Sequence, residues 1–270
     1  MKLSVMILIV IISLFITKYG RPDFLAWQNE GSYNQDGNIS DSLPSGPTKG
    51  FPFMLAMASV PESKDTSKNN IDLPKPKFKG SMSVEETIKK RRTERSFVSI
   101  ALSQQQLSQI LWAAQGITEE RGFKRSIPSA GALYPLDIFV VVGKEGVDDV
   151  QAGVYQYQPA HHQIKCVVPG DLRKKLAEAA LSQMWISRAP ISIVITAEYG
   201  RTTGKYGKRG LRYIHMEVGH AGQNIFLQAE SLNLGAGIVG AFADERVKDI
   251  LKLPDEYVPL LIMPVGAGNL

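Results

Sequence analysis

The chain has 270 residues, of which 44% are apolar, and this is enough to bury one sizeable core. Its formal net charge is +5, but Lys and Arg are scattered except at 89–95 and 201–212, so we expect no nucleic-acid partner. Cys166 is the only cysteine in the sequence, which excludes an intrachain disulfide and a thiolate metal cluster. Any redox chemistry would therefore need a bound cofactor.

The amino terminus carries an apolar run. Lys2 precedes it, residues 3–16 form it, and Lys18 closes it. Its length of about fourteen residues suits a signal peptide and falls short of the roughly 20 residues of a comfortable membrane span. The pattern predicts a signal peptide or membrane anchor over residues 1–19, and so an exported or membrane-anchored protein of the cell envelope.

The next segment, 20–80, is rich in Pro, Ser, Asn, Gly and Lys and shows no sustained helical or strand period. Such a composition is typical of a flexible linker, because it offers too little apolar surface to build a core. We expect the folded domain to occupy residues 81–270.

Two capping boxes open this domain, Ser83 with Glu86 and Ser103 with Gln106, and each predicts the start of a helix. We expect the first of these helices to end near residue 92 and the second near residue 116. A strand at 136–143, a hairpin of 154–158 and 163–168, a helix at 171–181 and a strand at 191–198 should follow. The last expected elements are a helix at 211–232, a strand at 238–242, a helix at 244–251 and a strand at 259–265. This irregular order favours an α+β sandwich with a mixed sheet.

Three arginines, Arg91, Arg92 and Arg95, fall within five residues at the end of the first helix. Such cations repel one another unless an anion lies among them, and a phosphate would serve. The alternative is a solvated basic helix end, which the helix dipole also favours.

The segment 128–135 (PSAGALYP) joins a polar loop to the strand at 136–143. Small residues between two prolines allow a flat ligand to approach the backbone closely, and Ser129 adds a hydroxyl group at that surface. Read alone, the segment is equally a tight turn before a strand.

Lys205 and Tyr206 lie in a glycine-rich stretch that we expect to be a loop between strand and long helix. An ammonium group beside a phenol stabilises the phenolate, which makes the pair suited to proton transfer. An exposed basic loop is the alternative. The later run 234–241 offers backbone amides, but no strand directly precedes it and the dinucleotide fingerprint is incomplete, which excludes a Rossmann site.

The long helix carries polar residues at helical spacing beside its apolar face. They are Glu217, His220, Asn224 and Gln228. They could face water or line a site, and Gly219 and Gly222 favour close packing against another helix or a partner chain. No second His or Cys is placed to bind a metal with His220, so we expect no metal site.

Together these segments resemble the nitroreductase-like flavoproteins, in particular the SagB-type dehydrogenases related to the azoline oxidases that form thiazoles and oxazoles. The resemblance is carried by RRTERSF (91–97), LSQILWAAQG (107–116), PSAGALYPLDIFVV (128–141), KYGKRGLRY (205–213) and EVGHAGQNIFLQAESLNLGAG (217–237). It implies a three-layer α+β sandwich around a mixed, mainly antiparallel sheet, and a homodimer that holds FMN at the subunit interface.

The resemblance also implies roles for individual residues. The phosphate, ribityl chain and ring edge of FMN would be bound by Arg91, Arg92, Thr93 and Arg95. The ring would face Pro128, Ser129, Ala130 and Gly131 of the other subunit. The backbone amides of Val239 and Gly240 would lie near its O4 and N5 atoms. The family's further basic pair near the carboxyl terminus has no counterpart in GAGNL (266–270), so phosphate binding would depend more on the arginines. Lys205 and Tyr206 would be the catalytic pair, with Tyr206 removing a proton while hydride leaves the neighbouring carbon.

The expected function is that of an FMN-dependent oxidoreductase acting on a small molecule or a peptide, with conversion of a peptide azoline to an azole as the specific form. An NAD(P)H-dependent nitro or quinone reductase is the alternative within the same chemistry. A membrane-tethered flavin-binding scaffold without turnover is the alternative of another class. The apolar amino terminus fits poorly with a cytosolic peptide-modifying complex.

Overall fold

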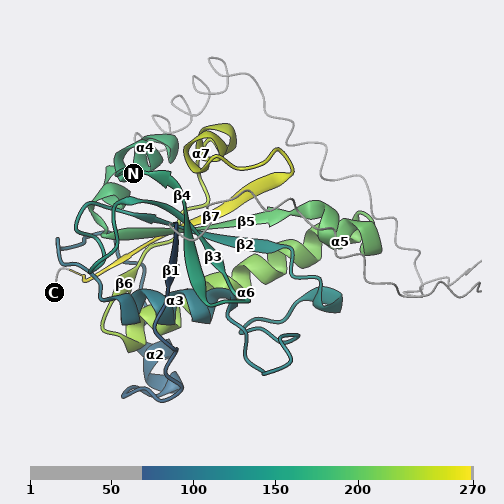
Figure 1. Cartoon of the computed structure of the whole chain (residues 1–270), viewed down its shortest axis with the longest axis horizontal. Helices are drawn as coiled ribbons and strands as arrows, with labels where there is room; N and C mark the ends of the chain where they lie inside the picture. The colour runs from purple at the N-terminus through teal and green to yellow at the C-terminus, as the bar shows by residue number, and fades with distance from the viewer. Residues whose placement is uncertain (1–68, 269–270) are drawn as a thin grey trace, which may run out of the picture. The chain divides into compact units, whose positions relative to one another are not determined.

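The computed structural model describes residues 69–268 (Figure 1). The predicted signal peptide or anchor at 1–19 and the greater part of the predicted linker lie outside the described residues. Among residues 69–268, no helix combines the length and the apolar character needed to cross a membrane.

A sheet of seven strands forms the middle of the fold, in the order β1-β4-β3-β2-β5-β7-β6. The strands are β1 (Asn70–Asp72), β2 (Leu136–Val142), β3 (Gly153–Gln158), β4 (Gln163–Pro169), β5 (Ile191–Glu198), β6 (Gly235–Ala236) and β7 (Tyr257–Gly266). Each neighbouring pair is antiparallel. β2 and β5 are almost wholly buried, as their near-continuous apolar sequences predict for central strands.

Helices cover both faces of the sheet (Figure 1). They are α2 (Val84–Lys90), α3 (Gln104–Gln115), α4 (Arg173–Ala179), α5 (Tyr199–Tyr206), α6 (Arg209–Ser231) and α7 (Asp244–Leu251). The alternation along β2 divides the core: Ile138 and Val140 pack with α3 and α6, whereas Phe139 and Val141 pack with α4 and α7. The structure therefore confirms the predicted α+β class and the three-layer sandwich.

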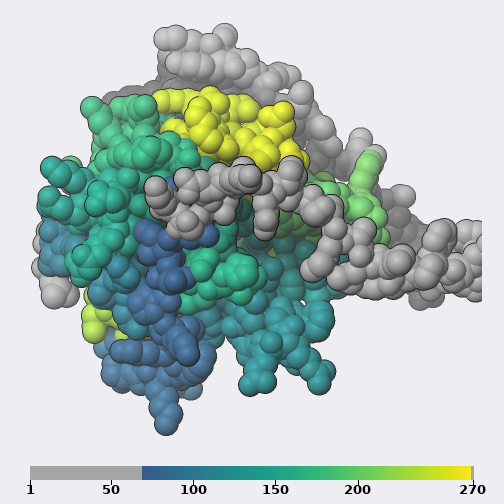
Figure 2. All heavy atoms as spheres, in the orientation of Figure 1, coloured from purple at the N-terminus to yellow at the C-terminus, as the bar shows by residue number. Residues whose placement is uncertain are grey.

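The folded part begins earlier than predicted. Asn70–Asp72 pairs with β4, and Leu73 is buried in the core. The Lys77 amide donates to Gln109 Oε1 on α3 at 2.8 Å. Figure 2 shows this segment, in the darkest blue, on the surface next to the helix that follows it. Residues 70–80 therefore belong to the domain and not to the linker predicted over 20–80.

Two further elements differ from the prediction. Residues 199–206 form the helix α5, where a glycine-rich loop was expected, and the chain turns at Gly207 with φ of 54°. The strand expected at 238–242 is displaced to Gly235–Ala236, because those two residues pair with the end of β7. Val239 forms only an isolated bridge to Ile262.

Candidate functional site

The segment after α2 runs along the edge of the sheet at β6. Thr93 forms a bridge with Ala236, and the Glu94 amide donates to the Ala236 carbonyl at 2.8 Å. A Cβ atom at Gly237 would lie 2.6 Å from the Trp185 ring and 2.8 Å from the Glu94 carbonyl oxygen. The glycine therefore allows the arginine segment and β6 to pack directly together, which fixes the backbone that carries Arg91, Arg92 and Arg95.

The arginines of this segment keep their charges unneutralised. Within residues 69–268, Arg91, Arg92 and Arg95 form no ion pair. The nearby carboxylate is engaged elsewhere, because Glu94 Oε1 accepts from the amides of Arg95 and Ser96 at 2.8 and 2.6 Å. The guanidinium groups of Arg91 and Arg95 lie over the rings of Phe226 and Trp185. Cations held in this way suit a phosphate group.

Val239 and Gly240, the two residues predicted to offer amides, differ in what their backbones can do. The Val239 amide donates to the Ile262 carbonyl at 2.9 Å, so it is not free for a ligand, and that part of the prediction is wrong. Gly240 is exposed, and a Cβ atom there would meet nothing within 4 Å. Only Gly240 of the two has room for a ligand beside its backbone.

The turn at 128–134 is held in a conformation that is rare for residues other than glycine. Gly131, Ala132 and Tyr134 have φ of 62°, 53° and 46°. Ser129 Oγ accepts from the Tyr134 amide at 2.9 Å and so closes the turn with its own side chain. The left-handed conformations of the two non-glycine residues, Ala132 and Tyr134, cost free energy and persist where surrounding contacts fix them.

Lys205 and Tyr206 meet this turn from the last turn of α5. A Cβ atom at Gly131 would lie 2.7 Å from Tyr206 Oη and 2.9 Å from Lys205 Nζ. The two segments, separated by more than seventy residues of sequence, therefore converge on one point. The Tyr206 ring packs edge-on against Tyr213 of α6 at 5.2 Å between centroids, which restrains the orientation of the phenol.

Arg201 joins α5 to the turn, a role that no motif in the sequence indicated. Its guanidinium group donates to Glu198 Oε2 at 2.7 Å, to Tyr257 Oη at 2.9 Å and to the Tyr134 carbonyl at 3.3 Å. It also pairs with Asp137 Oδ2 at 2.8 Å. One cation thus connects α5, the turn, β2 and β7. Its position four residues before Lys205 places both on the same side of α5.

The polar residues of α6 mostly face the protein interior. Glu217 is 2% exposed and lies beside Ser129 and Arg125. Asn224 Nδ2 donates to the carbonyls of Ala113 and Ser126, and Gln228 Oε1 accepts from Gln109 Nε2. His220 alone of the four is exposed. The spacing identified the stripe, but not the elements that cover it.

Burial raises the pKa of Glu217 to about 7, although the nearby Ser129 hydroxyl group and the charge of Arg125 both oppose the rise. Burial likewise raises the pKa of Asp137, against the opposite effect of Arg201. Two carboxyl groups with raised pKa values therefore lie close to the turn at 128–134.

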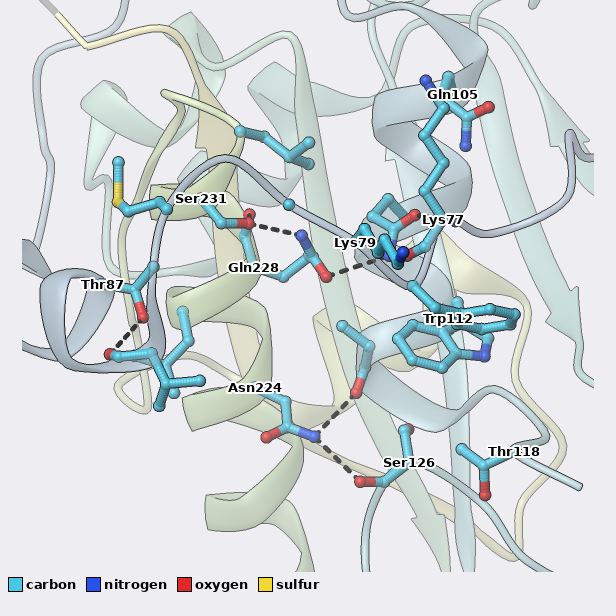
Figure 3. A pocket seen from close by; sticks show the side chains of 18 residues that line it. Lys77, Lys79, Thr87, Gln105, Trp112, Thr118, Ser126, Asn224, Gln228 and Ser231 are labelled. Carbon is cyan, nitrogen blue, oxygen red and sulfur yellow. Dashed lines mark hydrogen bonds between the residues drawn. The ribbon is translucent and has the colours of Figure 1, made fainter.

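A pocket of about 520 Å³ lies between α2, α3, α6 and the segment 77–82 (Figure 3). Its lining includes Lys77, Trp112 and Asn224, and Figure 3 shows the hydrogen bonds of Asn224 along one side. Neither Gly131 nor the Lys205–Tyr206 pair contributes to this lining. The pocket is therefore separate from the convergence point at Gly131.

The two groups of predicted residues lie at opposite ends of β7. Arg201 contacts Tyr257 at its start, whereas β6, next to the arginine segment, pairs with Gly266 at its end. The ten residues of β7 span about 30 Å. Figure 1 shows α5 at the right and β6 at the lower left. One chain therefore brings the turn and Lys205–Tyr206 together, but keeps them apart from Arg91–Arg95.

Comparison with known proteins places these features in context. The model of the nitroreductase family matches residues 88–267. MJ1384 of Methanocaldococcus jannaschii, a protein assigned to the nitroreductases, is 51% identical over 183 residues, which cover 68% of this chain and 90% of that protein. A crystal structure assigned to a nitroreductase of Ralstonia eutropha is similar with a TM-score of 0.66 and 27% identity, covering 84% of this chain and 100% of that one.

The microcin B17-processing protein McbC of Escherichia coli is 26% identical over 174 residues, which cover 62% of this chain. The chain thus spans 63% of the length of McbC. The microcin synthetase McbBCD complex with truncated pro-MccB17 has a similar fold, with a TM-score of 0.59 and 21% identity, covering 86% of this chain and 85% of that one.

Proposed function

The chain belongs to the nitroreductase family of oxidoreductases, and on that premise we propose that it is FMN-dependent and removes hydride from an organic substrate. The observation that carries the proposal is the convergence of Gly131, Lys205 and Tyr206 on one point. A proton-transfer pair next to an open, glycine-lined turn is what oxidation at a flat cofactor requires.

The residues of the structure fit FMN at both of its ends. The unpaired charges of Arg91, Arg92 and Arg95 would bind the phosphate, and Thr93 lies on the same fixed backbone. The exposed backbone of Gly240 would leave room for the ring, and the exposed turn at Gly131 would present the ends of Lys205 and Tyr206 to it. When bound, the flavin would supply a two-electron acceptor for hydride at N5.

Lys205 and Tyr206 would move the proton of the reaction. Lys205 Nζ lies 5.3 Å from the centroid of the Tyr206 ring, so the two side chains can act together on one proton. The pair would accept that proton from a substrate held beside Gly131. Arg201 would keep α5 against the turn, so that the acceptor oxygen stays in place between turnovers.

A second subunit would complete the site. The arginine segment and the Gly131 turn lie too far apart in one chain for both to hold one FMN, as the length of β7 indicates. In a homodimer with twofold symmetry, the arginines of one subunit could meet the turn of its partner, and two equivalent sites would form. The exposed Met216, Gly219 and His220 on α6 offer a surface for this contact.

For the substrate, we propose a peptide azoline, which would lose two hydrogens to become an azole. The similarity to McbC, a microcin-processing protein, supports this choice. The second candidate is reduction of nitro or quinone compounds with NAD(P)H, and the similarity to MJ1384 and to the Ralstonia eutropha protein favours it. The Lys205–Tyr206 pair favours the first, because a dehydrogenation needs a base beside the hydride acceptor.

The test replaces the catalytic pair in the full-length, FMN-loaded protein. With a synthetic peptide bearing one thiazoline ring, Tyr206→Phe and Lys205→Ala are expected to lower turnover about a hundredfold or more, since each removes part of the base. The flavin absorbance of both variants should stay that of the wild type. Lys208→Ala, an exposed change two residues further on, is the matched control. Unchanged turnover in Tyr206→Phe would contradict the proposed role.

A further inference from the structure

Glu217 is a buried acid that the proposed reaction does not yet use. It lies on the inner face of α6 and is 2% exposed. Within residues 69–268, its Oε1 atom has no hydrogen-bond partner. A buried polar atom without a partner costs free energy, so a carboxyl group kept in this state calls for an explanation beyond packing.

Two chains of contact lead from Glu217 to the catalytic pair. On one side Ser129 faces the carboxyl group, and two residues further Gly131 contacts the ends of Lys205 and Tyr206. On the other side Tyr213, one helical turn before Glu217, packs against the Tyr206 ring. The carboxyl group therefore lies next to the same turn that the Lys205–Tyr206 pair contacts.

The charged groups around Glu217 leave it only partly compensated. They are Arg125 from the segment before the turn, and beyond it Asp137 of β2, Arg201 of α5 and the phenol of Tyr134. Asp137 and Arg201 pair with each other, and the Arg125 guanidinium group donates to Gln115 Oε1 and lies over the Tyr134 ring. Glu217 forms no ion pair within the described residues.

A purely structural role does not require an acid at this position. A glutamine has the same shape and could also accept from Ser129, without the cost of placing an ionisable group in the interior. The balance between burial, which favours the neutral acid, and Arg125 with Ser129, which favour the carboxylate, holds the pKa of Glu217 at about 7. At that value the group can both take up and release a proton near neutral pH.

We propose that Glu217 stores the proton that the Lys205–Tyr206 pair takes from the substrate, and that it acts through the Ser129 hydroxyl group as a positioning residue without touching the substrate. This inference rests on the proposed function, because the stored proton comes from the proposed oxidation of the substrate. The substrate would lose a hydride to the flavin and a proton to the Lys205–Tyr206 pair. That proton would then pass through Ser129 to the Glu217 carboxylate, which returns the pair to its starting protonation state, so that charge and atoms balance.

The kinetic test uses the full-length, FMN-loaded protein and a synthetic peptide bearing one thiazoline ring. The steady-state turnover of the wild type is expected to rise about tenfold between about pH 5.5 and 8.5, as Glu217 becomes able to clear the proton from the pair between turnovers. Glu217→Gln should lack this rise, and its rate should equal that of the wild type only near pH 5.5. Ser129→Ala should lack it too, although it keeps the carboxyl group. Glu230→Gln, on the same helix, is the matched control and should keep the rise.

A second test needs neither flavin nor substrate. Infrared titration should show one carboxyl group that ionises near pH 7 in the wild type, that ionises at a higher pH in Ser129→Ala, and that is lost in Glu217→Gln. The pH dependence of the folding stability also reports on the raised pKa of Glu217. Because the pKa of Glu217 is raised in the folded state, its stabilising contribution is complete below its ordinary value of 4.5 and is lost as pH rises toward 7. The melting temperature of the wild type should therefore fall relative to that of Glu217→Gln as the pH rises from about 4 to 8.

The two tests separate this inference from the proposed function. A wild type that oxidises the peptide while Glu217→Gln keeps the full pH dependence overturns the proton store and leaves the function standing. A wild type that leaves the peptide unchanged contradicts the function, and the infrared titration then decides about Glu217 by itself. A carboxyl group near pH 7 that Glu217→Gln removes supports the proton store, and the absence of such a group in the wild type overturns it.

Discussion

At the scale of the residue, Gly131 determines whether the catalytic pair can reach the turn. Any side chain there would occupy the space of Tyr206 Oη and Lys205 Nζ, because its Cβ atom would lie 2.7 and 2.9 Å from them. Its φ of 62° adds a conformational cost for every other residue. Position 131 therefore couples the backbone of the turn to the chemistry of α5.

Gly131→Ala is expected to reduce turnover of the thiazoline peptide at least about tenfold, because the methyl group displaces the Tyr206 oxygen from its place over the turn. Stopped-flow measurement of flavin reduction checks this outcome. Gly204→Ala is the matched control on α5: a Cβ atom there meets nothing within 4 Å, and replacing a helical glycine should stabilise the protein by up to about 1 kcal/mol. Equal rates in Gly131→Ala and the wild type would contradict the geometry.

At the scale of the element, α5 shows where local sequence stops being informative. Gly200, Gly204 and Gly207 predict a loop from intrinsic preference, yet residues 199–206 are helical. The helix is held by packing, since Gly210 of α6 sits directly on the backbone of Thr202. Tertiary contacts of this kind override the propensity of a short segment and cannot be deduced from it.

Arg201→Met tests whether α5 depends on its central cation. The change leaves Asp137, whose side chain is 18% exposed, without its partner and removes the donor to the Tyr134 carbonyl. We expect a loss of about 2 kcal/mol in the free energy of unfolding by urea. Lys90→Met breaks the exposed pair with Glu86 and should cost less than about 1 kcal/mol. Equal losses in the two variants would show that Arg201 does not hold α5 in place.

Elements with a strong local pattern were predictable, and those set by distant partners were not. The capping box of Ser103 and Gln106 opens α3 as expected, with both of its hydrogen bonds formed. β6 was misplaced because pairing with Gly266, and not the apolar run that follows, decides where it lies. The stripe of Glu217 and Asn224 was visible in the sequence, but its burial depends on the segment that packs over it. Arg201 had no specific signal, since apart from the neighbouring Glu198 its partners lie in the turn, β2 and β7.

At the scale of the whole molecule, the two halves of the proposed site lie about 30 Å apart along β7. Because of this separation, mixing two inactive variants can show whether the two halves come from different subunits. A protein with Arg91→Ala and Arg92→Ala lacks one half-site, and a protein with Lys205→Ala and Tyr206→Phe lacks the other. Each should be inactive alone.

If the halves come from different subunits, a mixed dimer contains one site with all changes and one with none. Mixing equal amounts and allowing exchange should then restore about a quarter of wild-type activity, because half of the dimers are mixed and each has one intact site. Activity that stays absent after mixing, with mixed dimers shown by native mass spectrometry, would place both halves in one chain.

The central claim is that this chain binds FMN and uses it for hydride transfer, and the absorbance spectrum of the purified full-length protein tests it most directly. We expect the two visible bands of an oxidised flavin, their loss on anaerobic addition of the thiazoline peptide, and their loss again when the cofactor is stripped, with recovery on adding FMN. A spectrum without flavin bands that does not change when FMN is added would contradict the account.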